Sequence, residues 1–154
     1  MPNNSLLRWQ LQTSFAQRPL HVPGPVLPGL KISAGGRSTT NEYEGLVDTG
    51  ADVCVIPEEI ADELGLTFLE SEEMAARGAF DAQPQRRRVY FVKLLHAELG
   101  EAPICAMLRP RNTILIGRDF LAGIDVVKAA PSGAPKRVLT LDFGSNMWGL
   151  KACN

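Results

Sequence analysis

Asp48 is the residue of this sequence best placed to do chemistry. It begins an Asp-Thr-Gly tripeptide, residues 48–50, with apolar runs on either side at residues 46–47 and 53–56. This pattern predicts two buried strands joined by a tight loop that presents one carboxylate. Gly50 allows a sharp bend or the close approach of a ligand, and the Thr49 hydroxyl can tie the loop to a neighbouring loop.

A single carboxylate in such a loop is a poor catalyst, but two that face each other can work together. Like charges at short range cannot both ionise cheaply, so one carboxyl stays protonated as an acid while the other serves as a base. Such a pair could activate a water molecule for attack on a peptide carbonyl.

The tripeptide has two other interpretations. In an ordinary turn the Asp caps the backbone and the Gly adopts a positive φ, and on the tripeptide alone this interpretation stays open. The phosphate-binding turn of actin-like ATPases has the order Asp-x-Gly-x-Thr, which differs from the order here. At 154 residues the chain is also too short for that two-domain fold.

Composition narrows the class of protein. The length predicts one domain with a sizeable core, and neither the 45% hydrophobic content nor the net charge of −1 points to nucleic acid. Cys54, Cys105 and Cys153 lie far apart without Cys-x-x-Cys spacing, which argues against a disulfide framework or a zinc site and suits a reduced compartment. The sequence contains two histidines, His21 and His96, which is few for a His-based metal site or a Ser-His triad. We therefore expect no metal or cofactor.

The N-terminal segment predicts neither export nor membrane insertion. Residues 1–20 lack the pattern of a signal peptide, and no later stretch is long enough to span a bilayer, so we expect a cytoplasmic protein without a membrane partner. Residues 6–15 could form a strand. The Pro- and Gly-rich run that follows predicts an extended arm, residues 1–29, in front of the folded domain.

The domain that follows has the pattern of short strands. Residues 30–34, the turn at Gly35 and Gly36, and residues 42–48 predict a β-hairpin that leads to Asp48. Residues 57–65, PEEIADELG, predict a short helix with Pro in its first turn and Gly at its end.

The middle of the chain predicts a second pair of strands, at residues 67–72 and 87–95, around a turn at residues 77–82. Residues 72–76 could also start a helix, because their propensity allows it. Three consecutive arginines, residues 86–88, could face a substrate or an anion, but a solvated strand edge is the favoured interpretation because the chain carries no matching basic surface.

The stretch from residue 102 to 127 is the second informative one. It predicts an apolar strand through Met107, a break at residues 109–112, a strand at residues 113–116, and a short helix with Phe120 and Leu121. Residues 136–143 alternate as a strand. Residues 144–154 are expected to be a C-terminal tail.

Two motifs together resemble a known family. LVDTGADVCVIP, followed by ILIGRDFL, is similar to the retropepsin class of aspartic proteases, and the resemblance covers residues 30–143. It implies a mostly β, single-domain acid protease fold with one or two short helices. It also implies a symmetric homodimer in which each chain gives one Asp-Thr-Gly loop. The sequence contains one copy of that tripeptide, as this arrangement demands.

The resemblance assigns roles to individual residues. Asp48 would be the catalytic aspartate, and Thr49 would lock the two loops across the dimer axis. Gly50 and Ala51 would offer backbone groups to an extended substrate. Asp52 would form a supporting ion pair with Arg118, in which a guanidinium holds a carboxylate by two hydrogen bonds. The alternative for Arg118 is a surface salt bridge of little energetic value.

Further substrate contacts follow from the loop and the family pattern. Val53, Val55 and Leu115 would form apolar pocket walls. A hairpin flap over the substrate aligns with residues 77–83, which would bring Gly78 and Ala79 to the substrate, although Gly78 is the only glycine in this stretch.

Either end of the chain could supply the strands that join two protomers, through residues 6–15 or a segment after residue 138. The expected function is an aspartic endopeptidase acting on protein or peptide substrates. The alternative is a catalytically silent peptide-binding or assembly module on the same fold. An intact Asp-Thr-Gly favours the enzyme, because a scaffold has no need for a carboxylate at a like-charge interface.

Overall fold

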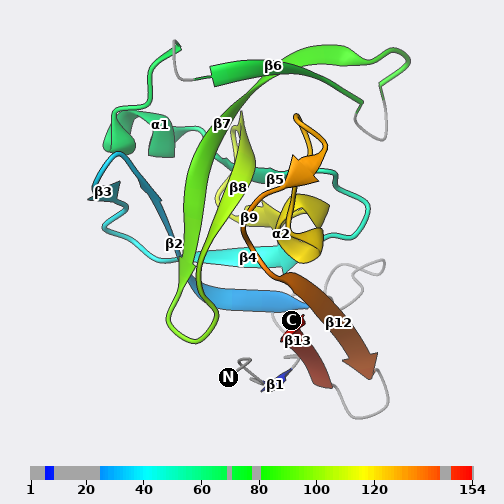
Figure 1. Ribbon diagram of the computed structural model, residues 1–154. Coiled ribbons are helices and arrows are strands. Elements are labelled where there is room, and N and C mark those ends of the chain that lie inside the picture. Colours follow the sequence, from blue (N-terminus) through cyan, green and yellow to red (C-terminus); the bar gives the residue numbers. More distant parts are fainter. Residues whose placement is uncertain (1–5, 9–24, 69–70, 78–80, 143–146, 154) are drawn as a thin grey trace, which may run out of the picture.

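The computed structural model describes residues 6–8, 25–68, 71–77, 81–142 and 147–153. It is a mostly β domain with two short helices, α1 (Glu59–Leu64) and α2 (Arg118–Ala122) (Figure 1). The strands are β1 (Leu6–Arg8), β2 (Val26–Ala34), β3 (Arg37–Ser38), β4 (Tyr43–Val47), β5 (Cys54–Pro57), β6 (Ser71–Ala76), β7 (Gln85–His96), β8 (Gly100–Arg109), β9 (Ile114–Ile116), β10 (Ile124–Asp125), β11 (Ala130–Pro131), β12 (Lys136–Asp142) and β13 (Met147–Cys153).

The main sheet closes on itself. Its eight strands run in the order β3-β2-β4-β9-β5-β8-β7-β6, and β2 also pairs with β7. Closure leaves no open edge along the ring β2-β4-β9-β5-β8-β7, and it encloses a core between the inner faces of these strands. A separate sheet, β1-β13-β12, lies on the side of the molecule away from the β6–β7 hairpin (Figure 1).

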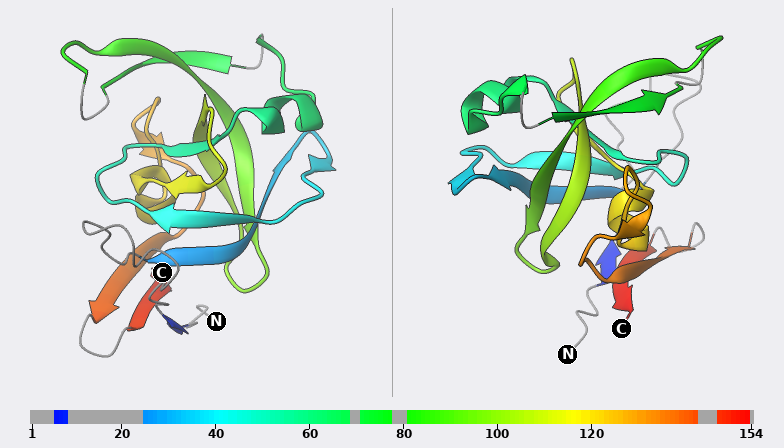
Figure 2. Two further views of the ribbon diagram at one scale, coloured as in Figure 1. Left: turned by 180° about the vertical axis from the view of Figure 1, so that it is seen from behind. Right: turned by 45° about the horizontal axis from the view of Figure 1, so that its top comes forward.

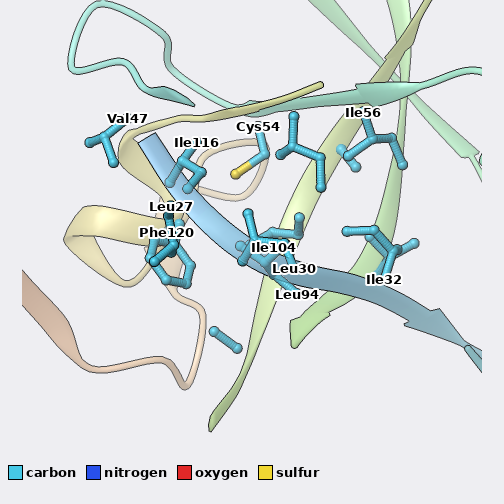
Figure 3. Packing of buried hydrophobic residues seen from close by; sticks show 14 of the residues in the cluster. Leu27, Leu30, Ile32, Val47, Cys54, Ile56, Leu94, Ile104, Ile116 and Phe120 are labelled. Carbon is cyan, nitrogen blue, oxygen red and sulfur yellow. The ribbon is translucent and has the colours of Figure 1, made fainter. Parts of the chain in front are cut away.

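The core is built from the inward-facing positions of the strands. Figure 3 shows Leu27 and Leu30 of β2 packing with Ile104 of β8 and Leu94 of β7, while Phe120 of α2 closes one end. All five side chains are at most 3% exposed. Each apolar side chain of this size removed from water contributes about 1.5–3 kcal/mol, which makes this cluster the main support of the barrel.

Most elements expected from the sequence are present. The helix predicted at residues 57–65 is α1, which ends at Gly65 with a left-handed φ of 65°. Pro57, expected in its first turn, is instead the last residue of β5, because it pairs with Arg109 of β8. Residues 113–116 and 136–143 correspond to β9 and β12, and the second short helix is α2. The helix could be predicted from the glycine that ends it, and the strands from their alternation of apolar and polar residues.

The first strand of the predicted pair at residues 67–72 was misplaced. It is β6, which begins at Ser71, because the Ser71 hydroxyl donates a 2.6 Å hydrogen bond to the carbonyl of Phe68 and closes a turn there. Residues 72–76 are a strand and not a helix, since they pair with β7 along the full length of β6. Pairing to a long neighbouring strand outweighs a weak helix propensity.

The expected N-terminal arm ends earlier than residue 29. β2 already begins at Val26, and Leu27 is fully buried. Pro28 and Gly29 fall where the pairing of β2 with β4 shifts register, and Gly29 has a φ of 76°. The Pro-Gly pair therefore makes a bulge inside a strand instead of ending the strand.

The expected C-terminal tail is also a strand. β13 pairs with β12 and with β1, and it buries Trp148 and Leu150. Of the strand considered at residues 6–15, β1 covers Leu6–Arg8, and residues 9–15 lie outside the described part of the chain. Among the helices that the structure describes, none has the length and apolar character needed to cross a membrane.

Candidate active site

Asp48 directly follows β4 and sits at the start of the loop that leads to β5. Its backbone N–H donates a 2.9 Å hydrogen bond to the carbonyl of Ile116, which ties the loop to β9. The N–H of Gly50 donates to the Asp48 Oδ1 atom at 2.9 Å, and the N–H of Ala51 donates to the Asp48 carbonyl at 3.2 Å. These bonds fix the carboxylate, while Thr49 and Gly50 are exposed.

Gly117, between β9 and α2, and the first residues of α2 pack against the loop that carries Asp48. Gly117 lies so close to it that a Cβ atom there would be 2.5 Å from the backbone carbon and oxygen of Val53. The N–H of Arg118 donates to the carbonyl of Ala51 at 2.8 Å, and the N–H of Asp119 donates to that of Asp52 at 3.1 Å. The two motifs of the sequence therefore meet through backbone contacts that only glycine at 117 permits.

Asp52 and Arg118 form an ion pair through one Nη atom and one carboxylate oxygen, and not through the two hydrogen bonds expected. Its side chains are 58% and 54% exposed, so solvent screens the interaction strongly in a single chain. The backbone bonds around Gly117, and not this surface pair, hold the loop in place within one protomer.

Sequence reasoning missed the buried carboxyl beside this loop. Asp119 is 1% exposed, and its Oδ1 atom accepts hydrogen bonds from the Cys54 thiol at 3.2 Å and the Phe120 N–H at 2.8 Å. Its Oδ2 atom accepts one from the Cys105 N–H at 2.9 Å. Burial raises the pKa of Asp119 to about 6, and the hydrogen bonds oppose that rise. The sequence offered one signal for this buried carboxyl: Asp119 directly precedes Phe120, an apolar residue of the second short helix.

A groove with a volume of about 690 Å³ opens beside Asp48. This volume suits a peptide segment or another ligand of comparable size. The predicted site residues that line it are Asp48, Gly50, Ala51, Asp52, Val53, Val55 and Leu115. Its other lining residues are Met74, Ala76, Arg77, Asp81, Arg87, Met107, Arg109, Pro110 and Arg111. The predicted contacts Gly78 and Ala79 lie outside the described residues.

The β6–β7 hairpin forms one wall of the groove. Met74 and Ala76 of β6 and Arg87 of β7 face the space beside Asp48. The hairpin extends well beyond the barrel in both views of Figure 2. The segment expected to be a flap, residues 77–83, joins these two strands, and its residues 78–80 lie outside the described part of the chain.

The three consecutive arginines separate onto two faces of the hairpin. Arg86 pairs with Glu73 at 3.1 Å and is 83% exposed, as expected of a solvated strand edge. Arg88 also pairs with Glu73, at 3.7 Å, but it is half-buried against the Phe68 ring. Arg87 lines the groove, so for this residue the prediction was wrong. The reason is the two-residue period of a strand, which sends the middle side chain of three to the opposite face.

The cysteines are thiols without disulfide bonds. Burial raises the pKa of Cys105 to about 12 and that of Cys54 far above its usual value, so both stay protonated and are unsuited to act as nucleophiles. Within the described ranges, no group of three or more His, Cys, Asp or Glu side chains is arranged to hold a metal ion.

A closed, mostly β domain that fixes an Asp-Thr-Gly loop beside a peptide-sized groove has the architecture of an aspartyl protease. The family described as "gag-polyprotein putative aspartyl protease" matches residues 36–123, which is more than half of the chain, and the chain belongs to this family. The resemblance to retropepsins drawn from the two motifs is therefore confirmed.

A solved structure of a foamy viral protease-reverse transcriptase in complex with an RNA/DNA hybrid is similar over 76% of this chain, with 18% identity and a TM-score of 0.46. The matched region is 13% of that longer chain. No curated protein matches this sequence.

Proposed function

We propose that the protein is an aspartic endopeptidase whose active site forms between two copies of the chain. The observation that carries this proposal is the position of Asp48, which is fixed by its loop at the side of a peptide-sized groove. Thr49 and Gly50, next to it, are exposed and free to meet a second loop.

The second carboxylate of the pair has to come from another protomer. Of the other acids that line the groove, Asp52 is engaged by Arg118, and Asp81 lies beyond β6 near the end of the hairpin. These 154 residues contain one Asp-Thr-Gly, which includes Asp48, and a second copy of the chain would supply the matching loop. A twofold axis beside Thr49 would place the two Asp48 carboxyls face to face.

The reaction follows from the shared proton of such a pair. The ionised Asp48 takes a proton from a water molecule as the water oxygen attacks the peptide carbonyl carbon. The protonated Asp48 of the other chain gives its proton to the carbonyl oxygen, which forms a tetrahedral diol. The C–N bond then breaks as the nitrogen takes a proton from one carboxyl and a hydroxyl of the diol gives its proton to the other carboxylate. A carboxylic acid and an amine leave, and the pair again shares one proton.

The groove supplies the binding contacts for an extended peptide. Val53, Val55 and Leu115 offer apolar walls. Gly50 is exposed beside Asp48, but its N–H donates to the Asp48 carboxylate. Both backbone groups of Ala51 are hydrogen-bonded within the chain, so the Gly50 carbonyl is the backbone group of this pair that we propose for the substrate backbone. The hairpin covers the other side and would exclude water from the reacting carbonyl.

The test is cleavage of a denatured protein and a peptide library from acidic to neutral pH. The Asp48→Asn variant should lose cleavage while its mass in solution stays that of a dimer. Asp62→Asn is the matched control, because Asp62 is an exposed acid in α1 and the chemical change is the same. Absence of cleavage by a confirmed wild-type dimer would instead support a peptide-binding module.

A further inference from the structure

The groove beside Asp48 carries an excess of positive charge. Arg77, Arg87, Arg109 and Arg111 line it, against the carboxylates of Asp48, Asp52 and Asp81. Asp52 is already paired with Arg118, which does not line the groove. The guanidinium groups therefore outnumber the acids that remain to balance them.

Two of these arginines have no carboxylate partner among the residues that the structure describes. Arg87, in β7 of the hairpin, is half-buried, and Arg109, at the end of β8, is exposed. Neither forms an ion pair within the described ranges. Their neighbours Arg86 and Arg88, on the other face of the hairpin, are both paired with Glu73. A half-buried guanidinium without a counter-charge is costly unless a ligand supplies one.

Arg111 is held in place beside the catalytic aspartate. Its Nε atom donates to the Thr113 carbonyl at 2.6 Å, and an Nη atom donates to the Thr113 hydroxyl at 3.0 Å. The charge of Asp48 raises the pKa of Arg111, although burial lowers it by more. This arginine is thus close enough to Asp48 to act on a ligand bound there, and its orientation is fixed in advance.

The lining also indicates which kind of anion fits. Apolar side chains, Met74 and Met107 among them, line the groove together with the arginines, and among the described lining residues there is no Phe, Tyr or Trp on which a nucleobase could stack. Apolar surface beside isolated guanidinium groups suits a peptide in which apolar and acidic side chains alternate.

Building on the proposed endopeptidase function, we propose that this protein selects peptides with an acidic side chain close to an apolar residue at the scissile bond. Arg87 of β7, Arg109 at the end of β8 and Arg111 in the loop that follows β8 bind the acidic side chain. The apolar residue sits against Val55, Met107 and Leu115. These arginines act as specificity determinants and take no part in the chemical step.

The experiment compares peptides that share an apolar core and differ only in Glu or Gln at each flanking position. Wild type should cleave the best Glu peptide about tenfold more efficiently than its Gln partner, which is the effect of one charge-assisted hydrogen bond. Arg87→Gln should abolish that preference by raising KM for the Glu peptide while kcat stays the same. Added salt should weaken the preference in wild type.

Arg86→Gln is the matched control, because it removes the same charge from the adjacent residue on the opposite face. It should keep the Glu preference. The reversal variant, Arg87→Glu, should prefer Lys to Glu at the same position, and a gain of this kind cannot come from misfolding. Equal cleavage of Glu and Gln peptides, or a preference that survives Arg87→Gln, would overturn the assignment and leave the protease function intact.

A binding measurement separates this inference from the protease proposal. In the Asp48→Asn variant, fluorescence anisotropy of labelled peptides should show tighter binding of the Glu peptide than of the Gln peptide, and Arg87→Gln should remove the difference. If no peptide is cleaved by wild type but this difference is found, the protease proposal fails and the specificity assignment stands.

Discussion

Among single residues, Asp119 has the clearest consequence for stability. Its carboxyl is almost completely buried, yet it accepts hydrogen bonds from the Cys54 thiol and two backbone N–H groups. Those donors favour the ionised form, whereas burial favours the neutral form and prevails. The residue therefore carries a proton more readily in the folded chain than in the unfolded chain.

This difference predicts a pH-dependent stability. Because the folded pKa is raised from 3.8 to about 6, the contribution of Asp119 is complete below the unfolded pKa and is lost as the pH rises through about 6. The loss should amount to about 3 kcal/mol. In urea unfolding, the stability of wild type relative to Asp119→Asn should fall by this amount between about pH 4 and pH 7.

These measurements should be made in the Asp48→Asn background, so that self-cleavage does not interfere. Asp62→Asn is the control, since this exposed acid should give no comparable trend. If the stability of wild type relative to Asp119→Asn rises with increasing pH, the assigned direction of the pKa shift is wrong.

Among the structural elements, the joint between α2 and the C-terminal sheet depends on one arginine. Arg137 of β12 is 9% exposed, and one Nη atom donates 3.0 Å hydrogen bonds to the carbonyls of Phe120 and Pro135. Its guanidinium carbon lies 3.9 Å from the centre of the Phe120 ring. Burial lowers the pKa of Arg137 to about 10, so the group remains a cation at neutral pH.

Removing this side chain should loosen the sheet from the barrel. Arg137→Ala should lower the free energy of unfolding by about 3 kcal/mol, because it removes a cation–π contact and two charged hydrogen bonds. Lys136→Ala, at the exposed neighbouring position, should change it by less than about 0.5 kcal/mol. Equal effects of the two substitutions, measured by urea unfolding, would show that the joint does not depend on Arg137.

At the scale of the whole molecule, the C-terminal sheet limits how dimerisation can be tested. Trp148 and Leu150 of β13 are 1% and 0% exposed, so truncation before them would unfold the protomer itself. Deletion of residues 1–8 removes β1 and leaves β12 and β13 in place, so it is the informative truncation for the idea that terminal strands join two protomers.

A shared active site also predicts an activity that depends on concentration. Once the protein is diluted below the dissociation constant of the dimer, each further tenfold dilution should lower activity per mole of chain by about tenfold. A tandem chain, with two copies joined by a flexible linker, should keep its activity per site under the same dilution. Constant activity of the wild type at concentrations where sedimentation shows a monomer would exclude the shared site.

Much of this protein could be predicted from local sequence. The Asp-Thr-Gly loop, the helix before Gly65 and the strand–Gly–helix motif around Gly117 each depend on neighbouring residues, on glycine conformations and on short-range periodicity. Of the eleven site residues predicted from the sequence, seven line one groove. Thr49 and Arg118 do not line it, and Gly78 and Ala79 lie outside the described residues. Family membership follows from these same motifs.

The tertiary structure alone decided features that depend on residues distant in sequence. The C-terminal segment forms the strand β13 because it pairs with β12 and β1. Pro28 lies within β2 because a β-bulge there accommodates it. The burial of Asp119 and the turn of Arg87 into the groove depend on which strand face meets which neighbour. Periodicity shows that a strand has two faces, but only packing determines which of them becomes the wall of a binding site.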